Sequence, residues 1–450
     1  MYSRRGAVLA GVAPFAVAAC RAGDDPAVVE DRSGDPAGRR EAPSVTFVST
    51  PDLFNGDVGD LSSTPRWDDG ANSLNDSWRR AVDTCLGAVA RHRPRAVLVA
   101  GDLVEGRWNL DPTGRELFGP VGQTVDLATL AQCRSAITAA GDVYYGHYAE
   151  MFRSRGLQLL PALGDHEILD DRTLGDVNER WSPGGVVLRG KEEGRPDNRF
   201  HLVPHAKRTW ADHFTLDAAG RPRYTDRPPG AAAGTAYAVD LGPMLRVVTV
   251  DVFHLHREGV RLGVFGPQLT WLRRTVRQAK RQGRVVVVQG HVPIIRPTRF
   301  HATGRLKVPE GVRSSFYRVM DAEGVDLYLC GEVHDATAQQ PHRRGTVQVS
   351  HGAVFRYAFN YLVGQVYPDR TVALDLYEMT VLRASRERGL WCTDPEKAQR
   401  SVVEYDPVPR RRGRLVLRDR RVLQRTGKLG RYDQGDDPWA YRGRLAPEWV

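Results

Sequence analysis

The sequence predicts an α/β protein with two packed mixed β-sheets, flanked by helices and followed by a basic C-terminal appendage. Short apolar runs alternate with patterns of helical spacing from residue 44 to about residue 380. Strands and helices alternate in the first part of this region, whereas strands dominate the later part, and this order favours two sheets packed on one another. A chain of 450 residues is long enough to bury a large core.

The first part of this region contains three predicted strands. They are the apolar runs at 45–50, 95–102 and 157–165. Helical spacing is found at 77–92, where Trp78, Val82, Cys85 and Val89 share one face, and again at 126–140 and 144–156. Residues 168–235 are polar, rich in Gly, Pro and Arg, and lack clear periodicity. We therefore expect them to form a long lid-like insertion over one end of the sheet.

The later part is richer in strands. The apolar runs at 235–241 and 244–253 predict an antiparallel pair joined by Gly242 and Pro243, and further strands are predicted at 284–291, 325–334, 345–352 and 371–379. Helices are predicted at 267–283, with Pro267 at its start and Gly283 past its end, and at 314–324. Residues 385–450 form the basic appendage, in which 400–405 and 414–419 are candidate short strands.

The N-terminal twenty residues have the composition of an export signal. Arg4 and Arg5 precede an uncharged stretch rich in Ala, Val and Gly. Ser3 to Arg5 resemble a twin-arginine signal, and residues 17–20 resemble a lipoprotein cleavage box in which Cys20 would be acylated. The alternative is an ordinary secretory signal in which Cys20 is incidental. We expect an exported protein, anchored through a lipidated Cys20 to the outer face of the bacterial cytoplasmic membrane, with residues 21–43 as a flexible tether.

Charge and cysteine content say less about function. The formal net charge is +10, and much of it lies in the Arg-rich segment 409–431. Such charge could attract anionic substrates, nucleic acid or an acidic envelope surface. Without interleaved aromatic residues or a recognisable binding fold, this segment is typical of a solvated face and argues against nucleic acid as the partner. Cys85 and Cys133 both lie on predicted helices and could form a disulfide.

Acidic and histidine residues follow the predicted strands, at the point where each strand ends. The residues are Asp52, Asp102, Asp165, His166, His291, Glu332 and His334. Because parallel strands share their carboxyl edge, side chains that are distant in sequence should meet there. Clustered carboxylates and imidazoles repel one another or stay unpaired unless cations lie between them, and a pair of divalent cations supplies that charge.

This series resembles the calcineurin-like metallophosphoesterase superfamily. That family carries D-x-H, G-D, G-N-H-(D/E), G-H and G-H-x-H at successive strand ends, and here "AGDLVEGR" (100–107), "GDHE" (164–167), "QGH" (289–291) and "GEVH" (331–334) match the last four. Asp165 stands for the Asn of the third motif, and Glu332 for the first His of the fifth. The resemblance implies a four-layer sandwich, with residues 44–384 as the catalytic domain.

The first motif departs most from the family. In "STPDLFNGDVGD" (49–60), Thr50 stands where Asp is expected and Asp52 where His is expected. We carry over Asp52 as the ligand, while Asn55, Asp57 and Asp60 remain alternatives because the register is ambiguous.

The resemblance implies two metal sites and a hydrolytic mechanism. The first site would use Asp52, Asp102 and His334. The second would share Asp102 and add Asp165, His291 and Glu332. The two ions would activate a bridging water and stabilise the charge of an in-line displacement on a small phosphoester. His166 would protonate the leaving oxygen or bind phosphate; the alternative is that it only hydrogen-bonds a ligand carboxylate.

The differences from the family motifs lead to a further expectation. Four carboxylates around two divalent ions give a nearly neutral centre, which favours phosphodiesters slightly over phosphomonoesters. Oxygen-rich ligation suits Mn, Fe, Mg or Ca better than Zn. The alternative function is a catalytically degenerate member of the family that binds a phosphorylated ligand or an envelope partner. A nucleic-acid-binding protein is a third hypothesis, and it predicts strongly salt-dependent binding.

Overall fold

A computed structural model describes most of the chain between residues 42 and 429. The described residues are 42–53, 76–104, 106, 108–111, 116, 118–124, 126–169, 186–187, 198–256, 259–296, 306–333, 336–352, 359–384 and 403–429. They belong to one compact unit. The predicted export signal, nearly all of the tether, and His334 lie outside the described residues.

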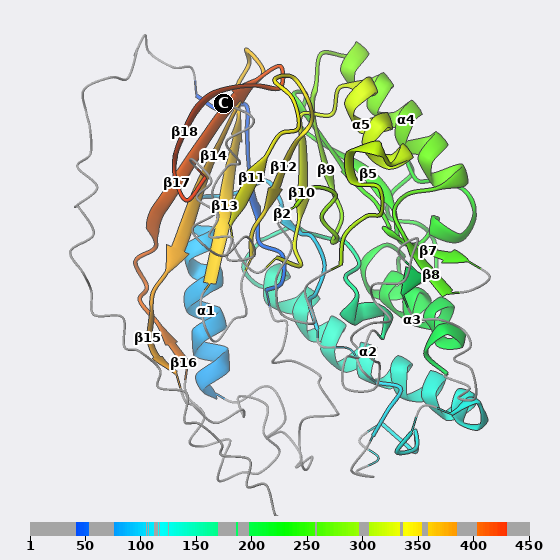
Figure 1. The fold of residues 1–450 in the computed structure, drawn as a ribbon. Helices are drawn as coiled ribbons and strands as arrows, with labels where there is room; N and C mark the ends of the chain where they lie inside the picture. Colours follow the sequence, from blue (N-terminus) through cyan, green and yellow to red (C-terminus); the bar gives the residue numbers. More distant parts are fainter. Residues whose placement is uncertain are drawn as a thin grey trace, which may run out of the picture. The chain divides into compact units, whose positions relative to one another are not determined.

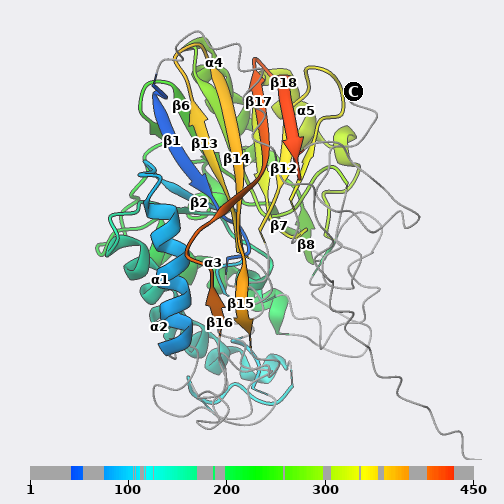
Figure 2. The same ribbon diagram turned by 90° about the vertical axis from the view of Figure 1, so that its left-hand side faces the viewer.

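A seven-stranded mixed sheet forms one half of the core (Figures 1 and 2). Its spatial order is β18 (Arg421–Gly427), β17 (Arg410–Arg418), β14 (Thr371–Met379), β13 (Phe359–Val366), β1 (Val45–Ser49), β2 (Val97–Val99) and β3 (Leu159–Pro161). Strands β1, β2 and β3 are mutually parallel, and the remaining pairs are antiparallel. The carboxyl ends of β1, β2 and β3 therefore share one edge.

A six-stranded mixed sheet forms the other half. Its order is β11 (Thr337–Gln339), β12 (Val347–Ser350), β10 (Leu327–Cys330), β9 (Val285–Gln289), β6 (Leu245–Thr249) and β5 (Tyr237–Leu241). Strands β12, β10, β9 and β6 run parallel, and β5 and β6 form the predicted antiparallel pair. All five residues of β9 are buried, as expected for a parallel strand covered on both faces.

The two sheets pack on one another, and helices flank them. Gln289 of β9 donates to the Leu160 carbonyl of β3 at 2.9 Å, and Tyr237 of β5 donates to the Pro161 carbonyl at 2.8 Å. One hydrophobic cluster contains residues of both sheets. The helices are α1 (Asp76–Ala90), α2 (Leu130–Arg153), α3 (Arg199–Phe214), α4 (Gly266–Arg281) and α5 (Ser315–Glu323). The predicted fold class is thus confirmed.

Smaller elements complete the described structure. A three-stranded sheet contains β4 (Val186–Val187), β8 (Gly259–Leu262) and β7 (Phe253–His256), and a two-stranded sheet contains β15 (Val381–Ala384) and β16 (Val403–Tyr405). Short 3-10 helices lie at Leu127–Thr129, His166–Ile168, Gly230–Ala232 and Gly311–Arg313. No helix within the described ranges is long and apolar enough to cross a membrane.

Several elements differ from the sequence-based expectations. The two helical segments predicted at 126–140 and 144–156 form the single helix α2. Gly141 lies inside this helix, and glycine is needed there because α3 approaches so closely that a Cβ would clash with Thr209. The predicted insertion, 168–235, supplies α3, and the predicted appendage, 385–450, supplies β16, β17 and β18. Strands β17 and β18 join the seven-stranded sheet through β14.

The proposed pairing of Cys85 with Cys133 was wrong. Both thiols are free and buried. The Cys133 thiol instead donates to the Asn109 carbonyl at 3.3 Å, and burial raises the pKa of Cys85 well above its ordinary value.

We expect Gly364→Ala to destabilise the fold strongly. Gly364 of β13 pairs with Phe47 of β1, and the Phe47 ring occupies the space that a Cβ would need. The clash should lower the free energy of unfolding by about 2–3 kcal/mol. Urea titration monitored by circular dichroism would measure it.

Gly87→Ala is the matched control. Gly87 lies inside α1 with open space around it, so the same change should stabilise the protein by about 0.5–1 kcal/mol. Equal effects of the two substitutions would contradict the assigned register of β1 and β13.

Candidate metal centre

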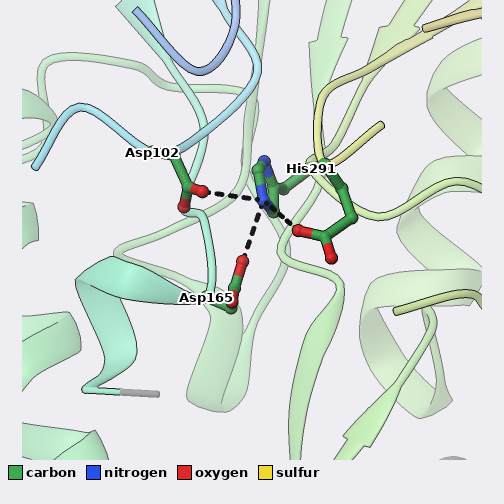
Figure 3. A group of neighbouring side chains, drawn as sticks. Asp102, Asp165 and His291 are labelled. Atoms are coloured by element: carbon green, nitrogen blue, oxygen red, sulfur yellow. Dashed lines mark hydrogen bonds and ion pairs between the residues drawn. The ribbon is translucent and has the colours of Figure 1, made fainter. Parts of the chain in front are cut away.

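Four buried side chains from two sheets converge at the shared strand edges. Asp102 follows β2, Asp165 follows β3, His291 follows β9 and Glu332 follows β10. Their ligand atoms all lie within 4.8 Å of one another. Figure 3 shows Asp102 and Asp165 pointing from the first sheet toward the imidazole of His291. This geometry is consistent with the expectation that parallel strand ends bring these residues together.

The imidazole of His291 lies at the centre of the group. Its Nδ1 is 2.8 Å from the Ala100 carbonyl, which can only accept, so the hydrogen-bond network assigns the proton to Nδ1. Its Nε2 lies 2.9 Å from Asp165 Oδ1, 3.3 Å from Asp102 Oδ2 and 3.4 Å from Glu332 Oε2. Neutral His291 would therefore aim a lone pair at three carboxylates, an arrangement that calls for a positive charge between them.

The donor set fits a divalent cation. Burial by itself lowers the pKa of His291, yet Asp102, Asp165 and Glu332 outweigh it and hold that pKa well above its ordinary value. The negative field that would retain a proton on Nε2 would equally attract a metal ion. Three carboxylates and one imidazole suit Mn or Fe and, with more oxygen ligands, Mg or Ca.

Two of these residues, and Asp52 beside them, adopt left-handed backbone conformations. Asp102 has φ of 56° and Glu332 has φ of 66°, both in the left-handed region, and Asp52 has φ of 53°. Asp tolerates this region better than Glu, and such residues cost on the order of 1–3 kcal/mol each. They persist because surrounding contacts hold them.

Asp52 lies next to the group of four. It is fully buried, its Oδ1 accepts the N–H of Glu332 at 3.2 Å, and the same oxygen lies 3.9 Å from His291 Nδ1. Burial raises the pKa of Asp52 well above its ordinary value; Asp102 and Glu332 add to the rise, and His291 opposes it. The predicted first site also requires His334, which lies outside the described residues, so this ligand set stays a prediction.

His166 is buried beside the same carboxylates. Its backbone N–H donates to Asp102 Oδ1 at 3.3 Å, and its Nε2 lies 3.8 Å from Asp102 Oδ2 and 4.0 Å from Asp165 Oδ2. The imidazole is therefore in the electrostatic field of two predicted ligands. Its role as proton donor or phosphate-binding group stays a prediction.

Glu167, to which the sequence argument gave no role, fastens two of the strand-end loops together. Its carboxylate accepts from the backbone N–H groups of Gly164 (2.6 Å), Leu103 (2.6 Å), Asp102 (3.0 Å) and Val104 (3.3 Å). Burial and then the Asp102 charge raise the pKa of Glu167 to about 7. Its place as the final acid of "GDHE" was the signal that could have identified it.

Glycine is required where these loops meet. A Cβ on Gly164 would clash with the Asp102 carboxylate, so only glycine lets the loop after β3 approach the loop after β2. Gly164, which precedes the predicted ligand Asp165, thus has a steric role.

His351 is a second residue that the sequence argument did not single out. It follows β12, is fully buried, and its Nε2 lies 3.0 Å from the Ser49 carbonyl of β1. The carbonyl requires Nε2 to carry the proton. Burial lowers the pKa of His351 to about 3, so this histidine ties the two sheets together in its neutral form.

Comparison with known proteins gives structural likeness only. No family model matches the sequence, and no curated protein matches it. A dimetal phosphatase from Danio rerio is 14% identical over 74% of this chain and 95% of its own, with a TM-score of 0.41. A putative 5'-nucleotidase from Staphylococcus aureus is 11% identical over 80% of this chain and 52% of its own, with a TM-score of 0.35. GAP50, the anchor in the inner membrane complex of Plasmodium, is 11% identical over 75% and 85%, with a TM-score of 0.33. At these identities the likeness concerns the fold alone.

We expect Asp165→Asn to stabilise the metal-free protein and to weaken metal binding. Removing one of three clustered carboxylates relieves repulsion, which should raise the free energy of unfolding without metal by about 1–2 kcal/mol. It should also abolish most of the rise in Tm on adding Mn. Thermal unfolding with and without Mn would measure both effects.

The control is Asp142→Asn, the same change on an exposed part of α2. It should leave the Mn-dependent shift intact. If Asp165→Asn destabilised the metal-free protein and kept the full shift, the carboxylates would not be the ligands.

We expect His351→Gln to reduce the acid sensitivity of the fold. Between pH 6.5 and about 3 the unfolded chain takes up a proton at His351 that the folded protein does not, so stability falls as pH falls through this window. The wild-type curve should therefore be steeper than the variant's by up to about 1.4 kcal/mol per pH unit. Urea unfolding from pH 7 to pH 4 tests this, and parallel curves would argue against a buried neutral imidazole.

Proposed function

We propose that the protein is a metal-dependent phosphoester hydrolase. The observation that carries this proposal is the convergence of Asp102, Asp165, Glu332 and His291 Nε2, all fully or almost fully buried, at adjacent strand ends. A buried cluster of three carboxylates has no evident structural benefit, because it costs desolvation and repulsion. Divalent cations bound there would polarise phosphoryl oxygens and lower the pKa of a water molecule.

We assign the residues of the site different roles in the proposed reaction. Asp102, Asp165, His291 and Glu332 would hold the cation, and the Ala100 carbonyl fixes the His291 tautomer so that Nε2 faces the site. Glu167 keeps the Asp102 and Asp165 loops at a fixed spacing. His166 donates a proton to the leaving oxygen or binds a phosphoryl oxygen.

A dinuclear centre is part of the proposal. Asp52 and His334 would complete a second site that shares Asp102. The buried carboxylate of Asp52, close to Glu332 and His291, supports this assignment. Two divalent ions would then be neutralised by four carboxylates, and a nearly neutral centre attracts a phosphate dianion less than a positive one does. We therefore propose a small phosphoester substrate, with phosphodiesters slightly favoured over phosphomonoesters.

Export and lipid anchoring through Cys20 complete the proposal. They rest on the composition of residues 1–20 and would place the enzyme on the outer face of the cytoplasmic membrane.

A degenerate, non-catalytic binding protein is the second candidate. Thr50 replaces the expected first-motif Asp, and its hydroxyl donates to the Asn360 carbonyl at 3.4 Å, a contact within the fold. This candidate would bind a phosphorylated ligand or an envelope partner without hydrolysing it.

A screen of matched esters tests the hydrolase. We expect turnover of bis(p-nitrophenyl) phosphate with Mn or Fe, at a kcat/KM above that for p-nitrophenyl phosphate. Asp102→Ala should lower kcat/KM by at least about a hundredfold, because Asp102 contributes to both proposed sites.

Asp142→Asn should retain full activity in the same screen. Ester binding without turnover under any of Mn, Fe, Zn, Mg and Ca would favour the non-catalytic candidate. Faster turnover of the monoester would refute the diester preference while leaving the hydrolase intact.

A further inference from the structure

An open-sided cavity lies between α4 and α5, helices that lie side by side in Figure 1. Its volume is about 590 Å³, and it is lined by Arg273, Arg277, Ser315, Arg318, Val319, Ala322 and Glu323. None of these residues belongs to the metal centre. A volume of this size is in the range of small-molecule binding sites.

The lining follows from helical spacing. Arg273 and Arg277 are four residues apart on α4 and lie on one face. On α5, Ser315, Val319 and Ala322 form a stripe of the same kind, with Arg318 at its edge. The cavity is therefore a groove between two facing stripes, with guanidinium groups on both walls.

The groove has an excess of positive charge. It contains three guanidinium groups and one carboxylate, a net charge of two positive units. Glu323 is already engaged, since Arg277 donates to both of its oxygens at 2.9 and 2.6 Å and Arg273 lies 3.8 Å away. Arg318 donates through Nε to the Arg313 carbonyl at 2.7 Å. Within the described part of the chain, no carboxylate forms an ion pair with Arg318.

Helix α4 adds further positive charge beside the groove, and Asp321, the other acid of α5, is already paired with Arg420 at 3.2 Å. Helix α4 also carries Arg274, Lys280 and Arg281 and has no acidic residue. Lys280 pairs with Asp326 at 2.8 Å, but both additional arginines are exposed. An anion entering the groove would thus gain attraction from several side chains and meet repulsion from Glu323 alone among the lining residues.

We propose that this groove binds a phosphorylated small molecule carrying two negative charges. Planar guanidinium groups can bind phosphate oxygens in pairs, which Arg318 and Arg273 would do from opposite walls. Val319 and Ala322 supply an apolar floor for the organic part of the ligand, and the Ser315 hydroxyl offers one further hydrogen bond. The site is separate from the proposed hydrolase centre and does not depend on it.

Calorimetric titration of metal-stripped, dialysed protein with glucose 6-phosphate tests the proposal. Removing metal prevents phosphate binding at the proposed catalytic centre, so this result and the hydrolase assay can fail independently. We expect saturable binding at one site and no binding of glucose. Arg318→Glu should weaken binding by about tenfold or more.

Two further variants separate a specific site from general charge. Ala322→Trp fills the groove without changing charge and should also abolish binding, because residue 322 is exposed and lines the cavity. Arg410→Glu makes the same charge change at an exposed position on β17 and should weaken binding by less than about twofold.

Three outcomes would overturn the proposal. They are the absence of glucose 6-phosphate binding, equal weakening by Arg318→Glu and Arg410→Glu, and binding to phosphatidylglycerol vesicles in place of the sugar phosphate.

Discussion

The three carboxylates that surround Nε2 of His291 are the constraint on which the rest of the site depends. Two unit charges 4 Å apart repel by about 4 kcal/mol at an effective dielectric constant of 20. Asp102, Asp165 and Glu332 are all buried, and their ligand atoms lie within 4.8 Å of one another, where the repulsion is only slightly smaller. This repulsion is comparable to a large part of the stability of a typical domain. The packing of two sheets holds the group together, and a cation would turn the repulsion into attraction.

Each sheet contributes two of the four ligand residues, so the centre lies across the join between the sheets. Hydrogen bonds from neighbouring residues hold the strand-end loops of this centre in place. Glu167 links the loops after β2 and β3, and Asp52 holds the backbone of Glu332. His351 joins β12 to β1. The left-handed conformations of Asp102 and Glu332 indicate that side-chain placement is maintained at a cost in backbone energy. This combination of charge repulsion and strain is typical of sites that function at the expense of stability.

Much of the fold could be predicted because its strands are short apolar runs with clear limits. The position of acids and histidines just past those runs also led to the expectation that they lie close together, and four of them do. Helix α3 was missed because Pro204 interrupts its pattern and Lys207, buried and paired with Asp251 at 2.6 Å, reads as a surface residue. The turn between β17 and β18 was missed because Asp419 and Arg420 adopt positive φ without glycine. Tertiary contacts hold that turn: Arg420 donates to the Asp321 carbonyl, and Gln340 donates to the Arg420 carbonyl. Such contacts between distant segments leave no local pattern in the sequence.

The central claim is that these buried carboxylates and the imidazole hold a metal ion. Diffraction from crystals soaked in Mn, recorded above the Mn absorption edge, locates any bound ion directly by its anomalous signal. The account predicts a strong peak within about 2.0–2.5 Å of Asp102, Asp165, Glu332 and His291 Nε2. A map with no peak there, or with Mn bound only elsewhere on the surface, would contradict it.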